Sequence, residues 1–111
     1  MAPRVLVIGL DCLDPDLVER FLPQLPVLRR LIREGEFRRL RSVDPPITVP
    51  AWMCAFTGRD PGELGVYGFR NRVDHSYGGL RIATSAAFRA PAVWDELGRM
   101  GLRSVVVGVP G

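Results

Sequence analysis

The strongest constraint on the fold is a pair of short apolar runs, one near each end of the sequence. The first is VLVIGL (Val5–Leu10), and the second is SVVVGV within Arg103–Val109. Both are rich in β-branched residues, and neither approaches the roughly 18 consecutive apolar residues that a membrane span needs. Such runs are typical of strands that are buried on both faces of a parallel sheet. The sequence therefore predicts a buried strand near each end.

The sequence between these runs predicts four helices, one more strand and a loop region. The helices are expected to start at prolines, which suit the first helical turn, namely near Pro15, Pro26, Pro50 and Pro91. The last three end before glycines. Phe37–Val43 is expected to form a strand, and Gly58–Ala87 to form loops with a short hairpin around residues 77–79. The alternation of strands and helices predicts the α/β class.

The charge pattern does not indicate a surface that binds nucleic acid. The net charge is +3, and all fifteen basic residues are arginine. Glu34 and Glu36 interrupt the densest local cluster, so a solvated face is favoured over a phosphate-binding patch. We expect no nucleic-acid partner. The cluster consists of Arg29, Arg30, Arg33, Arg38, Arg39 and Arg41.

The sequence indicates neither a secretory signal nor a membrane span. The apolar run that follows MAPR is too short for a signal-peptide core, and no small-residue cleavage site follows it. Cys12 and Cys54 match no disulfide framework and no zinc pattern, so reduced, partly buried thiols are expected. We therefore expect a cytoplasmic protein with no membrane partner.

Asp11 follows directly after the first predicted strand, at its carboxyl end. Ligands bind at the carboxyl ends of strands in α/β proteins, and a carboxylate there could hold a cation or orient a substrate. The alternative is a turn or helix-capping aspartate, because DCLDPD offers three acidic residues beside a helix start. Position alone does not decide between these interpretations.

Thr48 lies two residues before the helix that is expected from Pro50 to Phe56. N–H groups at a helix start favour an anion, so a hydroxyl there could attack phosphorus while the helix end receives the developing charge. Deprotonation of a threonine needs help, and a metal ion is the usual source. The alternative is a threonine that caps the helix or tightens the loop, and local physical chemistry alone favours that alternative.

Three separated motifs together resemble one protein family. They are GLDCLDPD (Gly9–Asp16), PPITVPAWMCAFTGRDPGELGVYGF (Pro45–Phe69) and APAVWDELGRMGLRSVVVGVPG (Ala90–Gly111). Their order and spacing resemble the type I phosphodiesterase and nucleotide pyrophosphatase family, which belongs to the alkaline phosphatase superfamily. The resemblance covers nearly the whole chain. It implies a three-layer α/β fold with a mainly parallel, alkaline-phosphatase-like sheet.

The resemblance also implies roles for two residues. Asp11 matches the family's first metal-binding aspartate. Thr48 matches a nucleophile that contacts the metals and becomes transiently phosphorylated. The resemblance further implies two divalent cations, commonly zinc. It also implies hydrolysis of a phosphodiester or phosphomonoester substrate.

Two departures argue against nucleotide specificity. The nucleotide-pyrophosphatase branch usually has asparagine three residues after the nucleophile, where this chain has Ala51. That branch also often has histidine where this chain has Leu64. The PAW version of the motif is more similar to a bacterial and archaeal group described as predicted phosphohydrolases or phosphomutases.

The sequence contains only part of the ligand set that a metal site needs. The single histidine, His75, lies in a polar segment and matches no ligand position of the family, so we expect a surface histidine. Residues 1–111 are therefore expected to be the amino-terminal part of one catalytic domain, weakly active or inactive alone. A carboxyl-terminal part or a second copy of the chain would supply the other ligands. The alternative function is a catalytically silent α/β module that binds a partner or a phosphorylated ligand.

Overall fold

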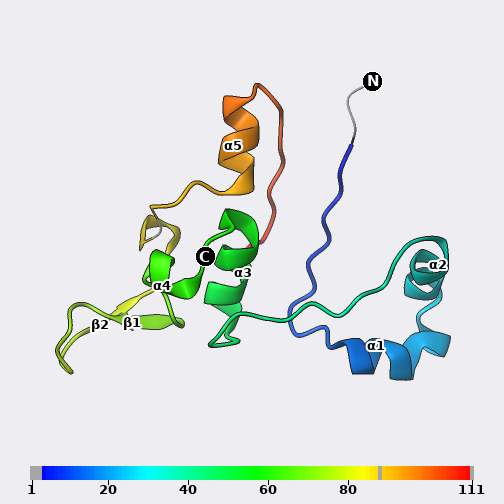
Figure 1. Cartoon of the computed structure of the whole chain (residues 1–111), viewed down its shortest axis with the longest axis horizontal. Helices are drawn as coiled ribbons and strands as arrows, with labels where there is room; N and C mark the ends of the chain where they lie inside the picture. The colour runs from blue at the N-terminus through cyan, green and yellow to red at the C-terminus, as the bar shows by residue number, and fades with distance from the viewer. Residues whose placement is uncertain (1–3, 88, 111) are drawn as a thin grey trace. The chain divides into compact units, whose positions relative to one another are not determined.

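The computed structural model describes residues 4–87 and 89–110 and divides into two compact units (Figure 1). The first unit is Met1–Arg41, and the second is Ser42–Gly111. Gly111, the last residue of the third sequence motif, lies outside the described residues, as do residues 1–3 of the expected domain.

The first unit is built from two short α-helices joined by a 3-10 turn. Helix α1 spans Pro15–Phe21, η1 spans Leu22–Gln24 and α2 spans Pro26–Glu34. Both α-helices begin with proline, whose fixed backbone and missing N–H suit that position, and α2 ends at Gly35. Val18 is the one buried residue among those described in this unit. Local sequence signals therefore contribute more to these helices than a core does.

The second unit contains three α-helices, a 3-10 turn and a two-stranded sheet among its described residues. In chain order they are α3 (Thr48–Thr57), α4 (Pro61–Leu64), β1 (Arg70–Arg72), β2 (Leu80–Ile82), η2 (Ser85–Ala87) and α5 (Val93–Arg99). Strands β1 and β2 are antiparallel, with Asn71 opposite Arg81. This hairpin confirms the expected turn around residues 77–79, where Gly79 has a positive φ of 70°.

A small apolar core lies in the second unit and involves α3 and α4. Val49, Met53 and Cys54 of α3 are buried together with Leu64 and Val66. The helical spacing of the three α3 residues puts them on one side of that helix. Three partly buried residues from flanking segments pack against this cluster: Val43, Ala83 and Ala90.

The three strands predicted for a parallel sheet are not strands in the structure. Residues 5–10, 37–43 and 103–109 form no ladder, and the sheet of the described residues is the antiparallel β1–β2 pair. Most of their apolar side chains are exposed, with Val5 at 85% and Val105 at 90%, whereas Val43 is partly buried against the core. A buried parallel strand needs a neighbouring strand and helices over its faces. The apolar pattern identifies segments that could become buried strands. The formation of such a strand also needs the neighbouring strand and the covering helices.

The predicted helices are present, although the ends of two are shifted. Helix α3 begins at Thr48, two residues before Pro50. Helix α5 begins at Val93, two residues after Pro91. Helix α4 lies in the region that was expected to be loop, although Asp60 and Glu63 form a capping box that the sequence already contains. None of the described helices is long and apolar enough to cross a membrane.

Candidate functional site

Thr48 is the first residue of α3, and Ile47 occupies the N-cap position in an extended conformation. The sequence interpretation was wrong in placing Thr48 before the helix. The alternative in which its side chain serves as the N-cap does not match its position either. The first N–H groups of a helix lie outside its hydrogen-bond ladder and carry the positive end of the helix dipole. The Thr48 hydroxyl therefore belongs to the helix end where negative charge is most stabilised.

The start of α3 is anchored by the residues that follow Thr48. Val49 is 5% exposed and Pro50 is fully buried, whereas Thr48 itself is half-buried. The N–H of Ala51 donates to the carbonyl of Ile47 at 3.0 Å, which closes the first turn. The apolar core thus holds the helix start in place and leaves the threonine at its edge.

Two other nucleophilic side chains of α3 are occupied or inactive. Burial, and then the charge of Asp60, raises the pKa of the Cys54 thiol, so little thiolate forms at neutral pH. The Thr57 hydroxyl donates to the carbonyl of Met53 at 2.7 Å and accepts from the N–H of Arg59 at 3.3 Å. Thr48, as the first residue of the helix, is the candidate nucleophile nearest to its positive end.

Asp11 lies in the first unit, in an exposed turn between residues 5–10 and α1. The N–H of Leu13 donates to the carbonyl of Leu10 at 3.3 Å, and Cys12 has a left-handed φ of 58°. The Cys12 thiol donates to Oδ2 of Asp11 at 3.7 Å. The carboxylate therefore stands at a tight turn on the surface of this unit.

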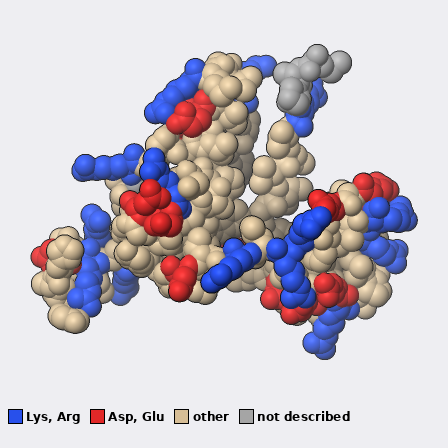
Figure 2. Space-filling model, viewed as in Figure 1, with Lys and Arg blue, Asp and Glu red and all other residues tan. Residues whose placement is uncertain are grey.

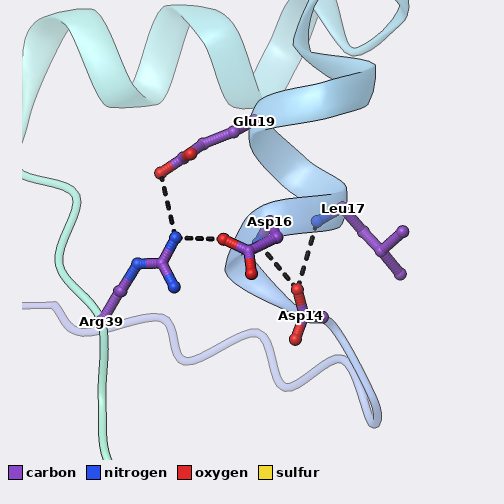
Figure 3. Close-up of polar contacts among 5 residues, drawn as sticks. All are labelled: Asp14, Asp16, Leu17, Glu19 and Arg39. Carbon is purple, nitrogen blue, oxygen red and sulfur yellow. Dashed lines mark hydrogen bonds and ion pairs between the residues drawn. The ribbon is translucent and has the colours of Figure 1, made fainter.

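The helix-capping role falls to Asp14 rather than to Asp11. Oδ1 of Asp14 accepts from the N–H groups of Asp16, at 2.7 Å, and Leu17, at 3.2 Å (Figure 3). These are the contacts of an N-cap residue. The capping alternative that the sequence left open for Asp11 is therefore not realised, and the turn position remains.

Three exposed arginines of the cluster form ion pairs with carboxylates. Arg39 pairs with Asp16 and, at 3.7 Å, with Glu19, and the hydrogen bond that its guanidinium donates to Asp16 raises its pKa (Figure 3). Acidic and basic side chains are also interspersed on the face drawn in Figure 2. Two further arginines of the cluster pair with neighbouring carboxylates, Arg33 with Glu34 and Arg38 with Glu36.

The described residues do not form a complete metal centre. No group of three or more His, Cys, Asp or Glu side chains suited to a cation occurs among them. His75 is exposed in the loop between β1 and β2, in agreement with a surface histidine. A zinc site usually has about four ligands, more than one carboxylate and one hydroxyl can supply. Asp11 and Thr48 alone therefore do not fit a two-cation centre.

The two candidate residues lie in different units. Asp11 belongs to the first and Thr48 to the second, and the structure places each with respect to its own unit.

Sequence reasoning missed a row of aromatic rings in the second unit. The rings of Trp52 and Phe56 stack with centroids 5.9 Å apart, and the ring of Trp94 lies 5.2 Å from Phe56 at a tilt of 48°. The four-residue spacing of the first two was a readable signal. Nothing in the sequence pairs them with Trp94 on α5, which is half-buried.

Comparison with known proteins identifies a family. A family model described as type I phosphodiesterase / nucleotide pyrophosphatase matches residues 5–111. No curated protein matches the chain, and no solved structure matches it.

Proposed function

Since this match spans nearly the whole sequence, the chain belongs to the type I phosphodiesterase / nucleotide pyrophosphatase family, and we propose that it supplies the nucleophile, Thr48, of a phosphohydrolase. The family is one of hydrolases that act as phosphodiesterases or pyrophosphatases. The proposed substrate is a small phosphodiester or phosphomonoester. The observation that carries the proposal is the place of Thr48 as the first residue of an anchored ten-residue helix.

The proposed reaction has two stages. In the first, Oγ of Thr48 forms a bond to phosphorus, the bond to the ester oxygen breaks, and the leaving alcohol takes a proton while the threonine proton goes to solvent. In the second, water attacks phosphorus and the bond to Oγ of Thr48 breaks, which releases phosphate from a monoester substrate or a phosphomonoester from a diester and returns the threonine hydroxyl. Charge on the phosphoryl oxygens faces the positive end of the α3 dipole in both stages.

The family is generally metal-dependent, and we propose that Asp11 is one ligand of a divalent cation and that Thr48 contacts the cations. Zinc is the proposed metal. Because the described residues do not complete such a site, the other ligands have to come from polypeptide beyond them. A carboxyl-terminal continuation and a second copy of the chain are the two proposed sources. We infer that the 111 residues alone turn over slowly or not at all.

The same completion would account for the exposed apolar segments. Residues 5–10, 37–43 and 103–109 have the composition of buried parallel strands but no partner strands among the described residues. We propose that they become strands of a three-layer, mainly parallel, alkaline-phosphatase-like sheet in the assembled catalytic domain. A cytoplasmic location, without nucleic-acid or membrane partners, is proposed with it.

The test compares two threonine variants of the same helix. In the natural protein purified with this chain in it, Thr48→Ala should lower kcat for bis(p-nitrophenyl) phosphate about a thousandfold or more, because the nucleophile is lost. The matched control Thr57→Ala, which removes only the hydrogen bond to the Met53 carbonyl, should retain activity. Metal content should be the same in both variants. Undiminished turnover in Thr48→Ala would overturn the assignment of the nucleophile, whereas absence of turnover in the unsubstituted protein would favour the silent-module alternative.

A further inference from the structure

A cleft in the second unit has no role in the proposed reaction. It has a volume of about 570 Å³ and lies between the segment 89–91 and helix α5. That volume is within the range of roughly 300–1,000 Å³ that small-molecule sites occupy. Its lining side chains include Arg89, Trp94, Asp95 and Arg99.

Arg89 contributes a positive charge to the cleft. It also lines a second cleft of about 330 Å³, together with Arg59 and Glu63. Arg59 is neutralised by Glu63 at 3.0 Å, and Arg99 by Glu96 at 2.6 Å. Within the described part of the chain, by contrast, Arg89 forms no ion pair. A guanidinium presents a planar fork of donors that matches a phosphate group.

Trp94 also lines this cleft. Its indole is half-buried and contacts Phe56 at a tilt of 48°, so the two rings are not stacked face to face. Gly98, one turn further along α5, also lines the cleft, and a Cβ built there would meet nothing within 4 Å. Space for a ring is therefore left beside the indole.

Asp95 adds an acceptor to the cleft. Its Oδ2 accepts from the N–H of Ala92 at 2.8 Å, which commits one carboxylate oxygen to the start of α5. The remaining acceptor capacity suits a ligand hydroxyl or amino group rather than a second phosphate.

We propose that this cleft binds a phosphate monoester that carries a flat ring, with Arg89 on the phosphate and Trp94 beside the ring. Phe56, which contacts Trp94, lies eight positions after Thr48, a distance of about 12 Å along α3 at the usual helical rise. The site is therefore at the far end of that helix from the proposed nucleophile. It does not depend on Thr48 being catalytic.

The test uses the fluorescence of Trp94 in the full chain. Trp52→Phe keeps an aromatic ring against Phe56 and leaves Trp94 as the sole tryptophan. AMP is the probe, with adenosine (no phosphate) and ribose 5-phosphate (no ring) as partial ligands. We expect a saturable change with AMP and weaker binding of both partial ligands. No response to AMP, or equal affinity for AMP and either partial ligand, would overturn the proposal.

Variants in the same background separate the parts of the site. Arg89→Gln should weaken AMP binding about tenfold or more, because a charge-assisted hydrogen bond is lost. The matched control Arg81→Gln removes the same charge from β2 and should leave the affinity unchanged. Glu96→Gln frees Arg99 and should tighten binding. Equal affinities in the Arg89 and Arg81 variants would overturn the role of Arg89.

Two further variants test the location. Gly98→Leu should abolish AMP binding by filling the cleft, and it should not impair folding because leucine favours a helix over glycine. Thr48→Ala should bind AMP as well as its parent does, even though the proposed hydrolase loses turnover. Retained binding in Gly98→Leu, or lost binding in Thr48→Ala, would place the ligand elsewhere and overturn the proposal.

Discussion

The two units of this chain contrast in how their helices are held. In the first unit, α1 has an aspartate cap and both α-helices start with proline, yet Val18 is the one buried residue among those described. In the second, α3 lacks a side-chain cap but contributes three residues to an apolar core. Local sequence signals are therefore enough to define a helix, whereas packing into an apolar core is needed to fix the helix in its unit.

The same contrast applies to the two candidate site residues. Asp11 stands in an exposed turn of the unit with little core, and Thr48 begins a helix that the core anchors. We infer that the proposed nucleophile is positioned by this chain, whereas the proposed metal ligand needs further polypeptide to be held in place.

Core truncation should produce the largest difference between the units. Met53→Ala, at a site 7% exposed, should lower the free energy of unfolding of the second unit by about 2–5 kcal/mol, because it leaves a cavity. Leu31→Ala in α2, at a site 52% exposed, should cost the first unit less than about 1 kcal/mol. Hydrogen exchange in increasing urea measures both units in one sample. Equal losses of unfolding free energy in the two units would contradict the proposed difference between them.

Thiol reactivity should give the next largest difference. Cys12 is exposed, and Cys54 is buried with a raised pKa, so Cys12 should react with iodoacetamide at pH 8 at least about tenfold faster. The stability that protonated Cys54 contributes should be complete below the ordinary thiol pKa of 9.0 and should fall as pH rises through the raised value. In the Cys54→Ala variant, the stability should no longer show this fall at high pH. Equal labelling rates would show that the core opens freely.

Helix caps should give the smallest effect. Asp14→Ala removes two hydrogen bonds at the start of α1 and should cost about 1 kcal/mol. Because α1 has little packing, its amides should lose protection from exchange. Asp60→Ala removes a comparable cap from α4, but the burial of Leu64 and Val66 should keep that turn formed. Identical loss of protection at both helices would contradict the proposed role of the core.

The sequence predicts the helices well because their signals are local. Proline in the first turn and a following glycine mark α2. The parallel strands were not found, since a ladder depends on partner strands and not on the segment's own composition. The overlooked α4 shows that a four-residue helix can rest on its cap and two buried side chains.

The candidate site was predictable in part. Asp11 and Thr48 stand out because several motifs recur at family-like spacing, and local physical chemistry alone left both with structural alternatives. The place of Thr48 at the first helical residue, rather than before it, needed the structure. The cleft between Arg89 and α5 could not be found from the sequence, because it depends on how α5 lies against the segment before it.

The most direct test of the central claim is to trap the phosphorylated protein. The natural protein containing this chain would be quenched in acid during turnover of a phosphodiester and digested with trypsin. Cleavage after Arg41 and Arg59 yields a peptide that carries Ser42, Thr48 and Thr57. Fragmentation of this peptide in the mass spectrometer should locate the phosphoryl group, which still carries the second ester of the substrate, on Thr48. Phosphate on Thr57 or Ser42, or an unmodified peptide from an enzyme that is turning over, would contradict the account.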